Sequence, residues 1–540
     1  MELTCQGIKD TGAYQRAGVG LPHFDVASTR DKADDDPRWV HLGFGNLFRA
    51  FIARMADDLL SRDIWWPIHG VQTIDSVGTV HQVTDHDLLS LRVGLGADGT
   101  RQLDVIGSLV AAIETTDPDG DERFLSLLAH PRVAVVTATI TEKGYRIGST
   151  GADGQFSFHP EVADAVHSGP QHSSQHAMVQ VARGLYRRFT AGGAPVTVIS
   201  FDNFSRNGDA FAEAVRTIAA AWNEHGFVDS DFIDWLGDED QVAFPVSVID
   251  KITPRPSGEV ADYLAELGFT DMAIDHSYGG PIAGFVNTEI PEYLLIEDRF
   301  AGDRPPLDTV GAIFTDRQTC LDFEKMKVTT CLNPVHTALA LSSCLLGVPS
   351  IDRAMGDEDL KALATVLVYH DSLPVVVNPQ VVTPEEFLDE LFTHRLTNSA
   401  MPDDPARIAM DTSQKLAIRF GETVTSSLQA GRDLGELVAI PLVLALFLRY
   451  RLGIDDAGQP MQCSPDPMQE RLDELVDGIG LSDTPLPEGK QEEIRGFLSD
   501  KSVFGFDLAA VGMDRRVLEL FTQLRSAPGA VRATIKKVVK

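Results

Sequence analysis

Three residues with side chains suited to alcohol chemistry lie close together in the segment LDFEKMKVTTCLNPVHTALA, residues 321–340. They are Lys327, Asn333 and His336, and the apolar residues around them have helical spacing. A lysine kept from water can exchange a proton with an alcohol. An asparagine amide can donate to a developing alkoxide, and a histidine can hold a neighbouring oxygen. The triplet therefore indicates metal-free interconversion of an alcohol and a ketone, although buried polar residues on helices often have only structural hydrogen bonds.

A glycine-containing turn near the start of the chain indicates a dinucleotide site. RWVHLGFG at 38–45 is an apolar run that ends in glycines, and the segment after it has helical periodicity. A strand, a glycine turn and a helix N-terminus together form a cradle for a pyrophosphate. Gly43 and Gly45 supply a G-x-G pattern, but Phe48 stands where a third glycine is usual, with Arg49 after it.

The next apolar run, IHGVQTID at 68–75, predicts a second strand that ends at Asp75. An acidic residue at this place can bind the adenosine ribose, although its distance from Gly43 is longer than the usual ~20 residues. A carboxylate there would repel a 2′-phosphate. The expected coenzyme is therefore NAD, with a plain loop aspartate as the alternative reading of Asp75.

Two further β-branched runs, 133–145 and 194–208, end in polar residues, as parallel strands buried on both faces do. Ligands bind at the carboxyl ends of such strands. Asn203 lies just past the second run, where it could donate to the reacting oxygen together with Asn333 or simply form an Asx-turn.

After about residue 290 the pattern becomes helical, with apolar residues three and four apart between Pro and Gly breaks. We therefore predict a polar lead-in over 1–37, a Rossmann-like α/β NAD-binding domain over 38–290 and a mainly α-helical substrate domain over 291–540. The active site is expected in the cleft between the two domains.

Composition limits the possible partners. The 540 residues include 79 acidic and 46 basic ones, giving a formal net charge of −33, which argues against nucleic acid as a partner. An anionic substrate would need a local group of Arg or Lys side chains. No run is long enough to cross a membrane, and LVAIPLVLALFL at 437–448 predicts a buried helix instead.

The cysteines and histidines favour a reduced, metal-free protein. The five cysteines are widely spaced without a CxxC pair, so we expect free thiols in a cytoplasmic protein without a signal peptide. His167, His172 and His176 have spacing that metal ligands can have, but no acidic or cysteine partner lies near them. We expect a polar loop there and no metal.

The Lys/Asn/His segment resembles that of the polyol-specific long-chain dehydrogenases and reductases, the mannitol dehydrogenase family. Five other stretches resemble the family in the same order: HLGFGNLFRAF (41–51), TATITEKGY (137–145), SFDNFSRNGD (200–209), VIDKITPRP (248–256) and IAMDTSQKL (408–416). The departure at Phe48 is the family's own pattern. The resemblance thus implies a set of cofactor-binding residues, namely Gly43, Gly45, Asn46, Phe48, Arg49 and Asp75.

The resemblance implies that a lysine is the acid/base, but two lysines compete for this role. Relatives place the lysine five residues before the asparagine, whereas Lys327 precedes Asn333 by six. At ~100° per residue the extra position would turn Lys327 away from His336, and Lys325 would share that face instead.

We prefer Lys327, because Glu324-x-x-Lys327 keeps the family's Glu-to-Lys spacing. Pro334 cannot donate a hydrogen bond to the carbonyl of Thr330. A one-residue π-bulge at this place would absorb the extra residue.

The resemblance also suggests how a substrate would be held. Arg395, in an R-x-x-N context, corresponds by position to the family's substrate-clamping arginine, although it could also be a surface arginine at a helix end. A guanidinium can grip a carboxylate or vicinal oxygens in two parallel hydrogen bonds. Lys415 and Lys251 are the reserve cations.

Members of the family transfer a hydride between a nicotinamide and a secondary carbinol of an open-chain sugar derivative. IAMDTSQKL is most similar to the fructuronate reductases, which implies interconversion of D-fructuronate and D-mannonate with NAD. FGNLFRAF is closer to the tagaturonate reductases, and mannitol 2-dehydrogenase is a third alternative. A redox-inactive regulator that binds sugar acids or nucleotides would be expected to lack the lysine. The sequence leaves the oligomeric state open between monomer and dimer.

Overall fold

The computed structural model of the chain describes residues 1–74, 77–151, 154–278, 280–401 and 403–540. Its contacts divide it into two compact units, Met1–Leu321 and Asp322–Lys540. The division falls inside helix α11 (Arg317–Lys325), later in the chain than the boundary predicted at residue 290.

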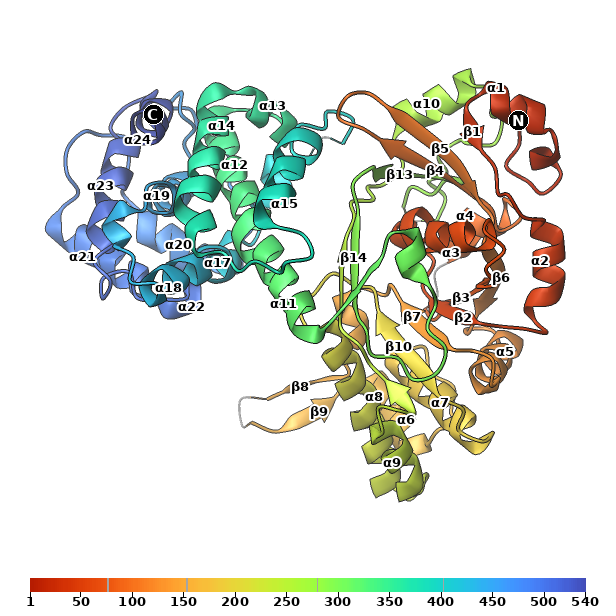
Figure 1. Cartoon of the computed structure of the whole chain (residues 1–540). Coiled ribbons are helices and arrows are strands. Elements are labelled where there is room, and N and C mark those ends of the chain that lie inside the picture. The colour runs from red at the N-terminus through yellow and green to blue at the C-terminus, as the bar shows by residue number, and fades with distance from the viewer. Residues whose placement is uncertain (75–76, 152–153, 279, 402) are drawn as a thin grey trace. The chain divides into compact units, whose positions relative to one another are not determined.

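The first unit is built on a parallel six-stranded sheet with the order β11-β10-β7-β2-β3-β6 (Figure 1). The strands are β2 (Trp39–Leu42), β3 (Ile68–Gln72), β6 (Leu109–Glu114), β7 (Val135–Ala138), β10 (Val196–Ser200) and β11 (Val242–Ala243). Numbered along the chain, they have the 3-2-1-4-5-6 order of dinucleotide-binding folds. Trp39 lies opposite Val135 and Leu42 opposite Ala138, so the strand order reverses between β2 and β7.

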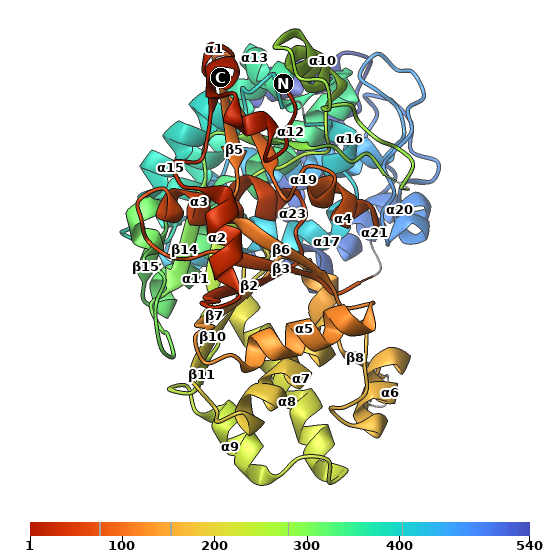
Figure 2. The same ribbon diagram turned by 90° about the vertical axis from the view of Figure 1, so that its right-hand side faces the viewer.

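Helices cover both faces of this sheet, as the unbroken apolar runs predicted. Side chains alternate along a strand, so Val40, Val136 and Val198 belong to one hydrophobic core, whereas Trp39 and Val135 belong to another. In Figure 2, α5, α7 and α8 lie on one side of the sheet and α3 on the other. These helices are α3 (Ala53–Leu60), α5 (Pro118–Ala129), α7 (Ala177–Thr190) and α8 (Asn207–Glu224), and the π-helical turn η2 (Phe48–Ile52) precedes α3.

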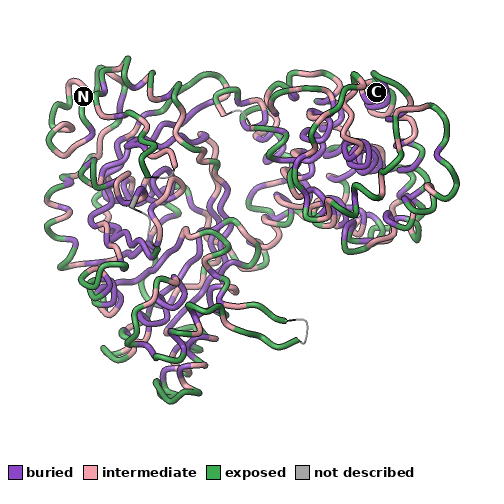
Figure 3. The backbone as a smooth tube through the Cα atoms, turned by 180° about the vertical axis from the view of Figure 1, so that it is seen from behind, coloured by how far each residue is buried: buried purple, intermediate pink, exposed green. Residues whose placement is uncertain are grey.

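Two smaller sheets and a hairpin complete the strands of this unit. One sheet has the order β1-β5-β4-β13, the other the order β12-β14-β15. Their strands are β1 (Val19–Gly20), β4 (Ser90–Leu95), β5 (Arg101–Ile106), β13 (Phe285–Glu289), β12 (Ser247–Asp250), β14 (Tyr293–Glu297) and β15 (Ile313–Thr315). The hairpin of β8 (Gly148–Thr150) and β9 (Phe156–Phe158) is largely exposed (Figure 3). The remaining helices are α4 (Val77–Thr84), α6 (Pro160–Ser168), α9 (Ser230–Gly237), α10 (Gly258–Glu266), η3 (Glu142–Tyr145) and η4 (Leu307–Val310).

The N-terminal segment, expected to be a polar lead-in, is instead folded into the first unit. It contains η1 (Gly7–Lys9), α1 (Thr11–Arg16), β1 and α2 (Val26–Ala33), and β1 pairs with β5. Leu3, Tyr14 and Val26 are buried. These apolar residues are too far apart to form a periodic pattern, which is why the sequence did not reveal their burial.

The second unit is helical. Its α-helices are α12 (Asn333–Leu346), α13 (Ile351–Gly356), α14 (Glu358–Thr365), α15 (Pro384–Glu390), α16 (Pro405–Ile408), α17 (Thr412–Leu416), α18 (Glu422–Gln429), α19 (Ala439–Arg451), α20 (Gln469–Val476), α21 (Glu488–Leu498), α22 (Lys501–Phe504), α23 (Asp514–Leu524) and α24 (Ala530–Val539). Helix α19 is buried along its whole length, as predicted for the apolar run at 437–448. The predicted fold class, a Rossmann-like α/β part followed by a mainly α-helical part, is confirmed.

Four helices of the second unit contain or adjoin a turn of π-helix: η5 (Met326–Cys331), η6 (Val366–Ser372), η8 (Leu391–Arg395) and η9 (Ala417–Gly421). Short 3-10 turns occur at η7 (Leu373–Val375) and η10 (Leu434–Glu436). Within the described ranges, no helix combines the length and apolarity that crossing a membrane would require.

Candidate active site

A cavity of about 470 Å³ opens at the carboxyl ends of β2, β3 and β7, where the strand order reverses. This is where dinucleotide folds bind their ligand. Its wall includes Gly43 and Gly45 after β2, Gln72 at the end of β3 with Thr73 after it, and the segment 139–141 after β7. Gly43 and Gly45 thus lie where the sequence predicted them, at the edge of a dinucleotide-sized site.

Gly43 is required by the geometry of the turn after β2. Its φ is +84°, a conformation that side chains disfavour, and an added Cβ would lie 2.5 Å from the carbonyl oxygen of Thr139. A Cβ at Gly45 would meet nothing within 4 Å. Gly43 therefore permits the close packing of the β2 and β7 loops, while Gly45 leaves an open backbone that a phosphate can approach.

Two predicted cofactor-binding residues have contacts within the protein. Arg49 is buried and donates through Nε to Ser90, through Nη1 to Gln82 and through Nη2 to the carbonyl oxygens of Ala283 and Gly284. The guanidinium thus joins the η2 turn to neighbouring segments of the first unit, and the predicted contact of Arg49 with a cofactor stays a prediction.

Phe48 is buried and stacks on the ring of His41 at 4.4 Å, and its predicted contact with a cofactor stays a prediction. Asn46 donates to the carbonyl oxygen of Pro254 at 3.2 Å, and its predicted contact with a cofactor stays a prediction. Asp75 lies outside the described residues, so its predicted role at the ribose stays a prediction as well.

His41 supports the glycine turn from within β2. Its two ring nitrogens lie 2.6 Å from Thr137 Oγ1 and 2.9 Å from Thr139 Oγ1, and the Thr139 hydroxyl also donates to the carbonyl oxygen of Gly43 at 3.3 Å. Burial lowers the pKa of His41 to about 3. A neutral imidazole thus supports the turn at Gly43 through Thr139, a role that the sequence gave no reason to expect.

Asp202 braces the loop after β7. Its carboxylate accepts from the backbone N–H groups of Ile140 (2.9 Å) and Thr141 (2.8 Å) and from the hydroxyl of Tyr145 (2.8 Å). Burial raises the pKa of Asp202. The next residue, Asn203, is exposed at the carboxyl end of β10. In SFDNFSRNGD the aspartate is therefore structural, and the role predicted for Asn203 at the reacting oxygen stays a prediction.

The second unit contains the Lys/Asn/His segment. Lys327 lies in the π-helical turn η5, and its carbonyl oxygen accepts from Leu332 N at 2.9 Å, a bond between residues five apart. The π-bulge expected from the six-residue spacing between Lys327 and Asn333 is therefore present. Lys327 is 1% exposed, whereas Lys325 is exposed and forms an ion pair with Glu422. These environments favour Lys327 as the acid/base.

Helix α12 begins at Asn333, directly after this turn, and His336 follows three residues later, almost one helical turn along α12. Burial lowers the pKa of His336 to about 4; Asp403 acts to raise it, whereas Arg419, Arg395 and Arg407 act to lower it. His336 is thus a neutral ring among cationic side chains, able to donate or accept a hydrogen bond without titrating near pH 7.

The three predicted substrate cations differ in position. Arg395 lies in η8, is 9% exposed and acts electrostatically on His336. The arginine predicted to clamp the substrate is thus one of the cations around His336. The Lys415 ammonium donates to the carbonyl oxygens of Ile408 and Met410. Its reserve role stays a prediction.

Lys251 lies in the first unit, with a fully buried side chain. Its ammonium forms an ion pair with Glu292 at 2.7 Å and donates to the carbonyl oxygens of Glu289 (2.6 Å) and Ile290. These acceptors occupy its donors within the protein, and its reserve role in substrate binding stays a prediction.

Arg419 is a further cation of the site that we did not predict. It lies in η9, and its Nη1 donates to Thr337 Oγ1 at 2.6 Å and to the carbonyl oxygen of Asn333 at 3.5 Å. Burial lowers its pKa to about 10. The available signal was its position four residues after Lys415, which on a helix places both cations on one face.

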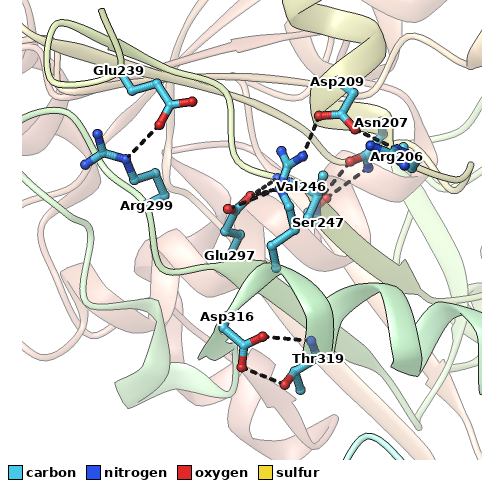
Figure 4. A network of polar contacts seen from close by, with 11 residues as sticks. Arg206, Asn207, Asp209, Glu239, Val246, Ser247, Glu297, Arg299, Asp316 and Thr319 are labelled. Atoms are coloured by element: carbon cyan, nitrogen blue, oxygen red, sulfur yellow. Dashed lines mark hydrogen bonds and ion pairs between the residues drawn. The ribbon is translucent and has the colours of Figure 1, made fainter. Parts of the chain in front are cut away.

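The helix that leads into η5 is fixed at its start in the first unit (Figure 4). Asp316 accepts from the backbone N–H and the hydroxyl of Thr319 at 3.0 and 2.7 Å. Arg317 donates to Asp209 of α8 at 2.7 Å and lies 3.2 Å from Glu297 of β14. These contacts hold the first residues of α11 against the first unit. The turn η5, which contains Lys327, follows α11 directly in the chain.

The histidine-rich segment is divided between two helices. His167 lies in α6, whereas the ring of His176 caps α7 by accepting from Met178 N at 3.3 Å, and His176 also lines the cavity. In the part of the chain that the structure describes, no group of three or more His, Cys, Asp or Glu side chains is arranged to hold a metal ion.

Two family models match the chain, one for each unit. Residues 37–276 match the mannitol dehydrogenase Rossmann domain, and residues 320–521 match the mannitol dehydrogenase C-terminal domain. The chain belongs to the mannitol dehydrogenase family. The predicted resemblance is therefore confirmed, and the second matched region begins at residue 320, next to the division at Leu321.

Among curated members of the mannitol dehydrogenase family, the D-mannonate oxidoreductase of Thermotoga maritima is 40% identical over 550 aligned positions, covering 100% of this chain and 99% of that protein. The polyol:NADP oxidoreductase of Gluconobacter oxydans is 30% identical, covering 83% of this chain and 86% of that protein.

Two solved structures of this family have the same fold over nearly the whole chain. A substrate-free D-sorbitol dehydrogenase is 26% identical with a TM-score of 0.79, covering 97% of this chain and 98% of that one. The mannitol 2-dehydrogenase of Pseudomonas fluorescens, in a ternary complex with NAD and D-mannitol, is 25% identical with a TM-score of 0.72, covering 100% and 99%.

Proposed function

We propose that this protein is an NAD-dependent oxidoreductase that interconverts D-fructuronate and D-mannonate. The observation that carries the proposal is the Lys327, Asn333 and His336 segment within reach of arginine charges in a chain whose net charge is −33. The full-length similarity to a D-mannonate oxidoreductase supports the sugar-acid substrate. The buried lysine argues against a redox-inactive regulator.

The first unit fits a dinucleotide. The open backbone at Gly45 and the close turn at Gly43 form a cradle suited to a pyrophosphate, beside a cavity of about 470 Å³. NAD is also the coenzyme in the solved complex of the Pseudomonas mannitol 2-dehydrogenase. When bound, the reduced coenzyme NADH would supply the hydride for ketone reduction, and the oxidised form NAD would accept it in alcohol oxidation.

The second unit supplies the proton and the charge stabilisation. In reduction the Lys327 ammonium donates its proton to the carbonyl oxygen, and in oxidation the neutral amine takes the hydroxyl proton. The Asn333 amide donates to the oxygen while it carries negative charge. His336 fixes a neighbouring substrate hydroxyl as a neutral ring, and Arg395 holds substrate oxygens at a distance from the reacting carbon. Asn203 of the first unit is proposed as a second donor to the reacting oxygen.

The test is a comparison of three substrates. The purified chain is assayed by loss of NADH absorbance with D-fructuronate, D-tagaturonate and D-fructose. We expect D-fructuronate to have the highest kcat/KM, about 10²-fold or more above fructose, because a site with cations for a carboxylate rejects an analogue that lacks it. NADPH in place of NADH tests the coenzyme.

Each alternative predicts a different result. A preference for tagaturonate would identify a tagaturonate reductase, and a preference for fructose a mannitol 2-dehydrogenase. NADH binding without turnover of any of the three would support a regulator. The cytoplasmic location expected from the cysteine pattern stays a prediction, as does the choice between monomer and dimer.

A further inference from the structure

Two buried arginines elsewhere in this chain, Arg188 and Arg49, donate hydrogen bonds through all three guanidinium nitrogens. Arg188 donates through all three nitrogens to a ring of backbone carbonyl oxygens, those of Leu128, His130, Val133, Ala194 and Pro195. Arg49 likewise uses Nε, Nη1 and Nη2. Such saturation is expected, since a buried charge without hydrogen-bond partners is costly.

Arg419 does not follow this pattern. Only Nη1 makes hydrogen bonds, to Thr337 Oγ1 and to the carbonyl oxygen of Asn333. Among the described residues, no acid pairs with this guanidinium, and no acceptor is recorded for Nε or Nη2. These two nitrogens form the edge of the guanidinium that binds a carboxylate side-on with two parallel hydrogen bonds. The unoccupied edge belongs to a partly buried cation and is available to a ligand carboxylate.

The other cations near His336 are already engaged. Arg407 forms an ion pair with Asp403, and Lys415 donates to backbone carbonyl oxygens. Arg395 lies buried and has interactions of its own within the protein. Arg419 is therefore the cation of this group best able to receive a new anionic partner.

The location of Arg419 determines what that partner is. Thr337, to which Arg419 is hydrogen-bonded, follows His336 directly and lies one turn of α12 after Asn333. An anion on the free edge of Arg419 would thus be close to the groups that handle the reacting and neighbouring oxygens of the substrate. The overall charge of −33 gives no general attraction for an anion, so a local cation must supply it.

We propose that Arg419 binds the carboxylate of the sugar-acid substrate through its Nε and Nη2 groups and so selects a keto-uronate over a neutral ketose. This rests on the proposed function. Arg395 then holds hydroxyl oxygens, and the two arginines divide the substrate between them.

The test compares Arg419→Gln and Arg419→Lys with wild type. We expect Arg419→Gln to lower kcat/KM for fructuronate by about 10²–10³-fold, since one partner of a charge pair is lost. Arg419→Lys keeps the positive charge but cannot form the bidentate contact. It should restore about a tenth or more of the kcat/KM that Arg419→Gln loses. Binding of D-mannonate and of D-mannitol to the enzyme with NADH is measured in parallel. The glutamine variant should weaken mannonate binding and leave mannitol binding unchanged.

Arg407→Gln is the matched control, because it removes a neighbouring arginine that already has an acid partner. It should change kcat/KM for fructuronate by less than about 5-fold, in line with an exposed pair. The proposal is overturned if Arg419→Gln weakens mannonate and mannitol equally, which would indicate a structural role through Thr337, or if it weakens neither. Measurements of NADH affinity and thermal unfolding show whether Arg419→Gln is misfolded. If it is, the same comparison of mannonate with mannitol binding in Arg419→Lys decides whether the proposal holds. Failure of the wild type to reduce fructuronate would instead count against the proposed function.

Discussion

At the scale of single residues, two lysines two positions apart have opposite environments. Lys325 is exposed and paired with Glu422, while Lys327 is buried in the η5 turn. The exposed amine of Lys325 exchanges its proton with water. The buried amine of Lys327 is kept from water, so it can exchange a proton with the oxygen of a bound substrate. The difference arises from the π-helical turn, which changes the direction in which Lys327 points relative to a regular helix.

Replacing Lys327 should therefore remove proton transfer and little else. Lys327→Ala should lower kcat for fructuronate reduction by about 10²–10⁴-fold, with NADH affinity unchanged. Lys325→Ala, the matched control, should retain near-normal kcat. Steady-state rates and NADH titration of both variants test this, and the reverse pattern would transfer the acid/base role to Lys325.

His41 links the cofactor turn to the acid sensitivity of the fold. Its pKa is about 3 when folded and near 6.5 when unfolded, so between these values the unfolded chain binds one proton more. This contribution to the free energy of unfolding is complete above about pH 6.5 and falls by at most about 1.4 kcal/mol per pH unit below it. The stability due to neutral His41 is thus lost in acid.

Substitution of His41 should alter the slope as well as the level of stability. His41→Gln should reduce the dependence of unfolding free energy on pH between about 4 and 6 by up to one proton. Thr139→Val removes a hydrogen-bond partner without removing the titrating ring, so it should lower stability and keep the slope. Denaturant unfolding at several pH values measures both, and equal slopes for His41→Gln and wild type would show that another group carries the effect.

The sequence predicted residues with local requirements better than those with distant partners. Gly43 was found because a tight turn after a strand needs glycine. The internal contacts of Arg49 and Lys251 were not predicted, because the direction of a long side chain depends on tertiary acceptors, here near Gly284 and Glu292. Such acceptors lie more than thirty residues away along the chain and leave no mark on the local pattern.

At the scale of elements, the strands and the long buried helix were predictable because their apolar runs are continuous. The small sheet that contains β1 and β13 was not, since its strands come from opposite ends of the first unit and pair only through the tertiary fold. The π-turn η5 was predictable because a six-residue spacing, a proline and a known family spacing conflicted with a regular helix. The other π-turns of the second unit had no such conflict to reveal them.

The η5 turn yields an element-scale prediction. If it absorbs one extra residue, deleting Val328 should restore a regular helix and the five-residue spacing of relatives, with Lys327 and His336 still on one face. The variant should fold and retain activity within about 10-fold of wild type. Deleting Ala338 from the regular part of α12 should instead abolish folding, because every following side chain turns by ~100°. Circular dichroism and NADH oxidation rates test both, and an inactive but folded Val328 deletion would mean that the bulge itself is needed.

At the scale of the whole molecule, a net charge of −33 opposes the approach of an anionic substrate, while Arg419 and Arg395 near His336 attract it at short range. The two effects differ in reach. At ~0.01 M salt the Debye length is ~30 Å, so the charge of the whole chain is felt, whereas at ~0.15 M it is ~8 Å and mainly local groups act.

Raising the ionic strength should therefore speed capture of the acid. We expect kcat/KM for fructuronate at saturating NADH to rise roughly 2- to 10-fold between about 0.01 and 0.15 M salt, because repulsion by distant carboxylates is screened first. A neutral ketose under the same conditions is the control and should show no trend. Initial rates at several salt concentrations measure both. A fall in kcat/KM for fructuronate would mean that attraction by the arginines near His336 extends further than repulsion by the rest of the surface.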